Sequence, residues 1–266
     1  MKPIIIIITF IATLGSAIAQ GELLFRVPCD GITTDLQGNV FVSRDFNLDM
    51  LSADGTRQLN YSEPTYGNIT QVDAGIASKI LVFYRESGTI VLLNNELSPI
   101  GGSLSLFNRS VMTVTLAAMG NPNKIVLYDD ANQDLLITDL SLKLLSRTDI
   151  TFPGEFHPTD MQVLPEHRIA LLDTLHGICL FDFYGTFERE IPIPGIQAMQ
   201  LMKDQIIYLK DNKLYRYSLP TASTPMNVEE IEAGHLWNRI KQFHIFQNIL
   251  YLIDKRENFP YRLFLR

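Results

Sequence analysis

Short apolar runs recur along this 266-residue chain at a nearly constant interval. Six such runs, each of three or four aliphatic and aromatic residues, occupy residues 40–42, 80–83, 125–128, 169–172, 206–209 and 250–253. Their first residues lie 40, 45, 44, 37 and 44 positions apart, with a mean of 42. A period of roughly 20 to 50 residues indicates stacked copies of one supersecondary unit, in which each copy buries its apolar face against its neighbours.

Each run has the composition of a β-strand and is followed by a polar turn and a second strand-like segment. The turns are rich in Asp, Asn and Gly, which favours hairpins, as at residues 129–132 and 210–212. A weaker strand precedes the run in most units, and a fourth can follow the hairpin, as at residues 186–191. Sustained helical spacing of apolar residues is missing, which argues against helical repeats. The pattern predicts an all-β fold, a six-bladed β-propeller with four-stranded antiparallel blades.

The two ends of the chain predict how the ring closes. The last unit stops at Arg266, directly after its third strand. Residues 22–27 precede the first unit and form an unassigned strand. We expect this N-terminal strand to complete the sixth blade as its outer strand, because a ring of blades closed in this way has no open seam.

Residues 1–19 have the pattern of a signal peptide. Lys2 supplies a positive start, residues 4–14 form an apolar run, and Ala17-Ile18-Ala19 is a small-residue cleavage site, so we expect cleavage between Ala19 and Gln20. The run of 11 residues is shorter than the roughly 20 that span a bilayer, and no later segment predicts a membrane span. We therefore expect an exported protein, periplasmic or extracellular, with residues 20–266 as a single propeller domain.

Composition narrows the classes of partner. A formal net charge of −7 and a pI near 5.2 argue against nucleic acid and against anionic membrane surfaces, which attract clustered Lys and Arg. The two cysteines, Cys29 and Cys179, belong to the first and fourth units, which are opposite one another in a six-bladed ring. Because a disulfide needs Cα atoms within about 7 Å, we expect two unpaired, buried thiols.

The first unit carries a recognisable motif. Asp35-Leu36-Gln37-Gly38-Asn39-Val40-Phe41-Val42-Ser43, with Asp54-Gly55 further on, is similar to the D-x-x-G-N-v-y-V-s…D-x-x-G pattern of an NHL repeat. The chain thus resembles six-bladed propellers of the NHL/TolB-like type, in architecture over its whole mature length and in motif over the first blade. The resemblance implies a binding or scaffold module, although hydrolases, lactonases and lyases also occur among such propellers.

Acidic residues recur in the turns between the second and third strands. In a propeller these turns, with the connectors that lead into the first strands, lie on one face around the channel, here called the upper face. The acids are Asp45, Glu86, Asp129, Asp130, Asp173, Asp211 and Asp254. Such a ring of carboxylates could hold a hard cation. The interpretation that we favour is that these side chains cap the turns through hydrogen bonds to the local backbone.

Histidines cluster in the fourth unit. His157, Asp173 and His176 would supply a transition-metal site on the upper face, with His235 as a further ligand. Their spacing matches no known ligand motif, so solvated or structural histidines are the simpler interpretation.

The upper face also gathers aromatic and Arg residues, a composition typical of binding surfaces. From it we predict a non-catalytic propeller that binds a protein or cell-envelope ligand through Arg44, Arg85, Asp130, His176 and Trp237. No cofactor is predicted for this function. The alternative is a metal-assisted hydrolase, lactonase or lyase at the channel mouth, in which His157, Asp173 and His176 hold a divalent metal. A catalytic motif such as Gly-x-Ser-x-Gly or His-Glu-x-x-His is missing from the sequence.

Overall fold

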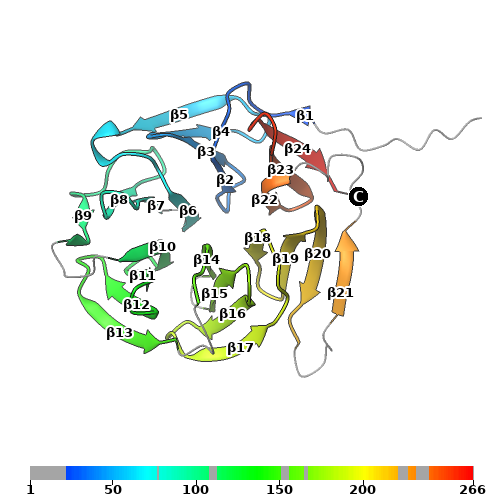
Figure 1. Cartoon of the computed structure of the whole chain (residues 1–266). Coiled ribbons are helices and arrows are strands. Elements are labelled where there is room, and N and C mark those ends of the chain that lie inside the picture. Colours follow the sequence, from blue (N-terminus) through cyan, green and yellow to red (C-terminus); the bar gives the residue numbers. More distant parts are fainter. Residues whose placement is uncertain are drawn as a thin grey trace, which may run out of the picture.

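Six four-stranded antiparallel sheets stand around a central axis in the computed structural model (Figure 1). The structure describes residues 22–76, 78–107, 113–150, 156–164, 167–220, 227–231 and 240–265. The only helix that lies wholly in these segments is a single 3-10 turn, η1 (Pro64–Tyr66). The prediction of a six-bladed β-propeller is confirmed.

In blades 1 to 5 the strands follow one another along the chain, from the axis outward. Blade 1 contains β2 (Gly31–Thr34), β3 (Val40–Arg44), β4 (Asn47–Leu51) and β5 (Arg57–Ser62). Blade 2 contains β6 (Gln71–Ile76), β7 (Lys79–Tyr84), β8 (Thr89–Leu93) and β9 (Leu104–Ser105). Blade 3 contains β10 (Val114–Asn121), β11 (Lys124–Asp129), β12 (Asp134–Asp139) and β13 (Leu144–Asp149). Blade 4 contains β14 (Asp160–Leu164), β15 (Arg168–Asp173), β16 (Gly177–Asp182) and β17 (Phe187–Ile191). Blade 5 contains β18 (Ala198–Leu201), β19 (Gln205–Lys210), β20 (Lys213–Ser218) and β21 (Asn227–Ile231).

The six apolar runs of the sequence are the second strands of the blades. β3, β7, β11, β15, β19 and β23 (Ile249–Asp254) each contain four or five consecutive buried residues. A second strand is covered on both faces because its blade packs between two neighbours, so its sequence is continuously apolar. The outer strands β13, β17 and β21 are mostly exposed.

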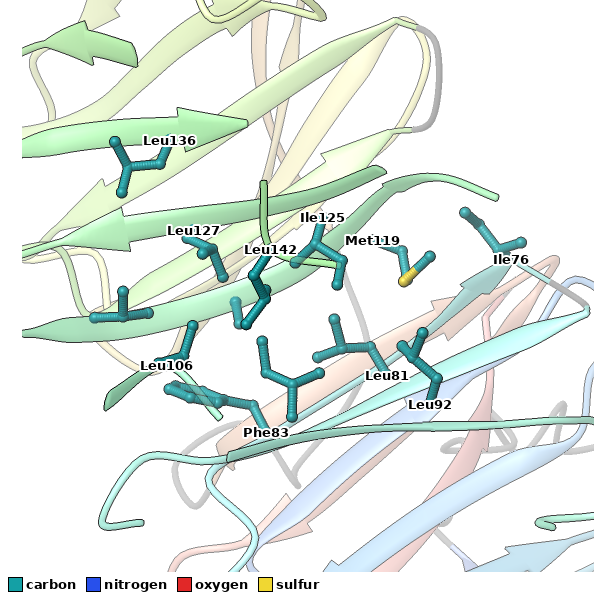
Figure 2. Packing of buried hydrophobic residues seen from close by; sticks show 13 residues of the cluster. Ile76, Leu81, Phe83, Leu92, Leu106, Met119, Ile125, Leu127, Leu136 and Leu142 are labelled. Atoms are coloured by element: carbon teal, nitrogen blue, oxygen red, sulfur yellow. The ribbon is translucent and has the colours of Figure 1, made fainter. Parts of the chain in front are cut away.

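The hydrophobic core lies between the blades and consists of six clusters, one at each junction. Figure 2 shows the junction of blades 2 and 3, where Leu81 and Phe83 of β7 face Met119, Ile125 and Leu127 of the next blade. Each blade is therefore held by apolar contacts with both of its neighbours.

The N-terminal strand closes the ring, as predicted. Blade 6 contains β22 (Ile240–Phe246), β23, β24 (Pro260–Phe264) and, as its outer strand, β1 (Glu22–Leu23), which pairs with β24. The strand is shorter than the predicted residues 22–27: Leu24 still donates its N–H to the carbonyl of Pro260 at 2.9 Å, but the residues after it leave the sheet. Arg262 of β24 ties the closure together by donating to Glu22 at 2.9 Å and to the carbonyl of Ala53 in blade 1 at 2.5 Å.

Both cysteines are buried and unpaired, as predicted. Burial raises the pKa of each thiol to about 12, so neither is a nucleophile at neutral pH. A separate finding concerns membranes: in the described segments, no helix has the length and apolar character needed to cross a bilayer.

Ring closure gives a stability prediction at Gly55, in the turn between β4 and β5. Its φ is +88°, and a Cβ atom there would lie 2.0 Å from the carbonyl oxygen of Leu24. We expect Gly55→Ala to lower the free energy of unfolding by about 3 kcal/mol or more, because the N-terminal segment must move away. Gly101, with φ +75° and nothing within 4 Å of an added Cβ, is the control. Its change to Ala should cost only the backbone strain of about 1 kcal/mol, measured by urea denaturation. Equal losses in the two variants would contradict the closing contact.

Candidate functional site

The upper face brings together four of the residues singled out in the sequence. His157 precedes β14, and its Nδ1 lies 3.0 and 3.2 Å from the two carboxylate oxygens of Asp130, in the β11–β12 turn. The backbone N–H of His157 donates to Asp173 at 2.7 Å, and His176 Nδ1 lies 3.2 Å from the other oxygen of Asp173. The ring of Phe156 lies beneath this group, with its centroid 6.2 Å from that of His176.

Asp173 acts as a turn cap in this cluster. It is buried, and its carboxylate accepts hydrogen bonds from the N–H groups of Leu175 at 2.7 Å and His176 at 3.1 Å, besides that of His157. Burial works to raise the pKa of Asp173, but these hydrogen bonds outweigh it and lower the pKa below its ordinary value. The carboxylate is therefore held in its charged form by the backbone.

Two other acids at the same position are also buried and hydrogen-bonded. Asp254 accepts from the N–H groups of Arg256 at 2.8 Å and Glu257 at 3.0 Å, and Asp129 accepts from Asn132 Nδ2 at 2.8 Å and from the Thr113 hydroxyl. The backbone contacts support the capping interpretation for Asp173 and Asp254, whereas Asp129 is bonded by side chains, and Asp45, Glu86 and Asp211 accept no such backbone bond among the described residues. Among the described residues, no group of three or more His, Cys, Asp and Glu side chains is arranged to hold a metal ion.

Arg44, the last residue of β3, and Arg85, in the turn after β7, lie at the corresponding places of blades 1 and 2, apart from the histidine cluster. Arg44 is exposed, with Nε 3.9 Å from Asp45. Arg85 is exposed too, and its Nε donates to the carbonyl of Thr115 on β10 at 2.9 Å, so it lies at the mouth of the central channel. Trp237 and His235 lie outside the described residues.

The central channel is a second candidate site, which the sequence analysis did not identify. The innermost strands β2, β6, β10, β14, β18 and β22 surround a cavity of about 930 Å³. Its middle is lined by polar side chains on alternate positions of these strands: Gln71, Asp73, Asp160, Gln162, Gln200 and His244.

Several of these side chains connect an innermost strand to another blade. Gln162 donates to the carbonyl of Met199 at 2.6 Å and accepts from the N–H of Leu201 at 2.8 Å. Gln200 bonds both backbone groups of Ile245, at 2.6 and 2.8 Å. We call these contacts the amide belt.

The belt continues on the other side of the channel. Gln71 accepts from the N–H of Ala117 at 3.2 Å and donates to the carbonyl of Met161 at 3.0 Å, while Asp73 accepts from the N–H of Met119 at 2.8 Å. At the seam between blades 6 and 1, Nδ1 of His244 is 3.0 Å from the hydroxyl oxygen of Thr34. Side chains of the channel wall thus satisfy backbone groups on the open edges of the innermost strands.

Burial shifts the titratable groups of the channel toward their neutral forms. It raises the pKa of Asp73, raises that of Asp160 from 3.8 to about 6, and lowers that of His244 from 6.5 to about 4. A sequence signal for this group does exist. Pairs of polar residues two positions apart, Gln71 and Asp73, Asp160 and Gln162, and Gln242 and His244, interrupt otherwise apolar strands.

Comparisons with known proteins establish the fold and no family. No family model matches the chain, and neither does any curated protein sequence. The structure is similar to that of a streptogramin B lyase, with a TM-score of 0.62 and 12% identity over 93% of this chain and 97% of that one. It is also similar to the WD40 β-propeller domain of Doa1, with a TM-score of 0.63 and 12% identity over 93% and 82% of the two chains. A chain of the mitotic checkpoint complex matches with a TM-score of 0.60 and 11% identity over 88% and 75%.

The amide belt predicts an unequal effect of two matched substitutions. Gln200→Leu removes both hydrogen bonds to Ile245 and leaves its N–H and C=O, which are buried, without those partners. We expect a loss of roughly 2 to 4 kcal/mol in the free energy of unfolding. Gln242→Leu should change it by less than about 1 kcal/mol, because among the described residues Gln242 makes no such bonds. Equal effects in chemical denaturation would show that the belt does not hold the blades.

The channel also predicts opposite pH dependences for two variants. Neutral Asp160 stabilises the fold at low pH, and this stabilisation is lost as the pH rises from 3.8 through about 6. Neutral His244 stabilises the fold above pH 6.5, and this stabilisation is lost as the pH falls toward about 4. Relative to the unmodified protein, Asp160→Asn should gain stability as the pH rises from about 4 to 6, by up to about 3 kcal/mol. His244→Gln should gain stability as the pH falls over the same interval. Denaturation curves at several pH values measure both, and parallel profiles for all three proteins would contradict the shifts.

Proposed function

We propose that this protein is an exported, non-catalytic binding or scaffold propeller whose upper face binds a protein or cell-envelope ligand. The observation that carries the proposal is that buried and exposed polar residues have different roles on this face. Buried acids such as Asp129 and Asp173 hold the turns of blades 3 and 4 in place, while His157, beside them, and Arg44 and Arg85, in blades 1 and 2, are exposed on the same face. Fixed turns lower the entropy cost of binding, and Arg is among the residues that most often dominate interfaces.

Other features support parts of this proposal. Propellers commonly mediate protein binding, and one similar structure is a chain of the mitotic checkpoint complex. Export rests on the signal-peptide pattern of residues 1–19. Blade 1 offers a physical reason for the residues of the NHL-like motif, which supports the NHL/TolB-like type. Asp35 accepts hydrogen bonds from the N–H groups of Gln37 and Asn39, both at 2.9 Å, and Gly38 has a φ of +88°.

The alternative is a metal-assisted hydrolase, lactonase or lyase that uses His157, Asp173 and His176. These residues do lie together on the upper face, and the similar structures include a lyase. The alternative differs from a binding propeller by a measurable property, since it needs a stoichiometric divalent ion.

The test is capture of the partner by matched variants. Mature chain is immobilised, and the cell-envelope and secreted fractions of the source organism are passed over it. A double variant, Arg44→Ala with Arg85→Ala, should retain the captured partner at least about tenfold less well. Arg216→Ala, which removes an equally exposed and ion-paired Arg from β20, should retain it fully.

Three outcomes of this experiment contradict the proposal. The first is capture that is specific but unchanged in the double variant, and the second is no specific capture at all. The third comes from metal analysis of the purified protein: one equivalent of a divalent metal that the His157→Ala variant lacks. In that case the metal-assisted enzyme replaces the proposal. Circular dichroism of each variant controls for folding. Trp237 remains a sequence-based prediction for the same surface.

A further inference from the structure

The junction between blades 6 and 1 differs from the other junctions in how it is closed. Within this chain, blade 6 is joined to blade 1 through β1, and the pairing of β1 with β24 covers two residues. Two further backbone bonds complete the closure, from Leu24 to the carbonyl of Pro260 and from Cys29 to that of Asn258. The apolar cluster here has 8 buried residues, against 9 to 13 at the other junctions of the described structure. A boundary with so short a pairing and so small a cluster is where local opening costs least.

His244 lies at this junction and contacts two groups from different blades. Its Nδ1 is 3.0 Å from the hydroxyl oxygen of Thr34 in blade 1, and its Nε2 is 3.4 Å from Nε2 of Gln200 in blade 5. The orientation of the Gln200 amide is fixed, because its oxygen accepts from the N–H of Ile245 at 2.6 Å and its nitrogen donates to the carbonyl of the same residue at 2.8 Å. Gln200 therefore presents an N–H to His244. This assigns the proton of the neutral ring to Nδ1, which donates to Thr34, and leaves Nε2 as the acceptor.

Protonation of His244 disrupts this arrangement. An imidazolium carries a hydrogen on both ring nitrogens, so its Nε2–H would oppose the N–H of Gln200. The Gln200 amide cannot turn to present its oxygen without losing both bonds to Ile245. The charged ring would therefore break the contact between blades 5 and 6, or leave its place between them and blade 1.

The strands around His244 offer no anion to compensate a positive charge. Neither β2 nor β18 contains a titratable residue, and burial is the only cause that lowers the pKa of His244 to about 4. The titratable groups nearest in the fold are Tyr251 and Asp254 on β23, Lys241 on β22, Asp35 after β2, and Asp73 and Asp160 on the channel strands β6 and β14. Asp35 and Asp254 are occupied by backbone N–H groups of their own turns, and Lys241 is a second cation.

We propose that the junction of blades 6 and 1 is an acid-sensitive closure, at which protonation of His244 separates the two blades while the other junctions stay closed. The remaining bonds of the amide belt come from Gln71, Gln162, Gln200 and Asp73, and none of these side chains gains a positive charge as the pH falls. Opening at this junction gives access to the apolar cluster that contains Cys29. The device does not depend on the proposed function of the upper face.

The two cysteines report on local and global opening in the same molecule. Cys29 is buried in the cluster between blades 6 and 1, and Cys179 is buried in the cluster between blades 3 and 4. The mature chain is treated with short pulses of 4,4′-dithiodipyridine, a disulfide that still modifies accessible thiols in acid, at pH values from about 7 to about 3. Peptide mass spectrometry measures the modified fraction of each cysteine. We expect the ratio of Cys29 to Cys179 modification to rise at least about tenfold as the pH falls through about 4.

Matched variants assign the effect to His244. His244→Gln stays neutral at every pH, so its ratio should change by less than about twofold over the same interval. Glu22→Gln removes the ion pair with Arg262 at the same junction, and it should retain the rise. His167→Gln, which changes an exposed histidine at the lower mouth of the channel, should retain it as well. Circular dichroism at each pH controls for folding.

The proposal is overturned if the ratio in the unmodified protein stays constant over the pH interval, or if Cys29 and Cys179 become reactive together, as in global unfolding. It is also overturned if the rise persists in His244→Gln. The ratio in the unmodified protein needs no substitution, so it decides between local and global opening even where a variant fails to fold.

Discussion

The structure depends on how the open edges of its innermost strands are satisfied. In every blade the first strand pairs with the second on one side only, and its other edge faces the channel. Unpaired backbone N–H and C=O groups are costly when they are shielded from water, and no further strand fits at the axis. Gln162, Gln200 and Gln71 replace that strand with hydrogen bonds to the backbone of the following blades. The same contacts set the spacing of the blades near the axis, on which the six apolar clusters between them depend.

This arrangement also explains the character of the channel. Side chains that reach a neighbouring strand must be polar, yet behind the channel wall lie the apolar clusters between blades, with Phe41, Met161 and Phe243. Polar groups in such surroundings lose water, so the carboxyls of Asp73 and Asp160 acquire raised pKa values, and His244 a lowered one. The amide belt thus stabilises the backbone, but it leaves the ionisable side chains beside it poorly solvated. Strongly shifted groups in a cavity are typical of ligand sites, although structural networks produce them as well.

The sequence was sufficient for the architecture because the most regular strands are also the most buried. Second strands such as β7 and β15 are covered on both faces and form continuous apolar runs that can be counted. The missing outer strand of blade 6 was predicted from that count alone, but its length was overestimated, because after Leu24 the chain leaves the sheet for the connector to β2. The turn-capping interpretation of Asp173 and Asp254 also followed from sequence, since an Asx turn is made within a few residues. The channel site was not predicted, because its carboxyls and amides come from blades about 40 residues apart and meet only when the ring is closed.

The polar residues of the upper face fall into two groups: buried acids that stabilise the turns, and exposed side chains that face solvent. Asp129, Asp173 and Asp254 are buried at equivalent turns and bond to groups within the protein, so replacing them disturbs the frame itself. The side chains of Arg44 and His157 are exposed and lie 3.9 and 3.0 Å from the carboxylates of Asp45 and Asp130. Structures only 11% to 12% identical to this chain are similar to it in fold, so most of its residues can differ while the architecture is kept. In such a fold an exposed turn residue can change without altering the repeat, whereas a polar residue of the innermost strands that bonds the next blade, such as Gln162 or Gln200, cannot.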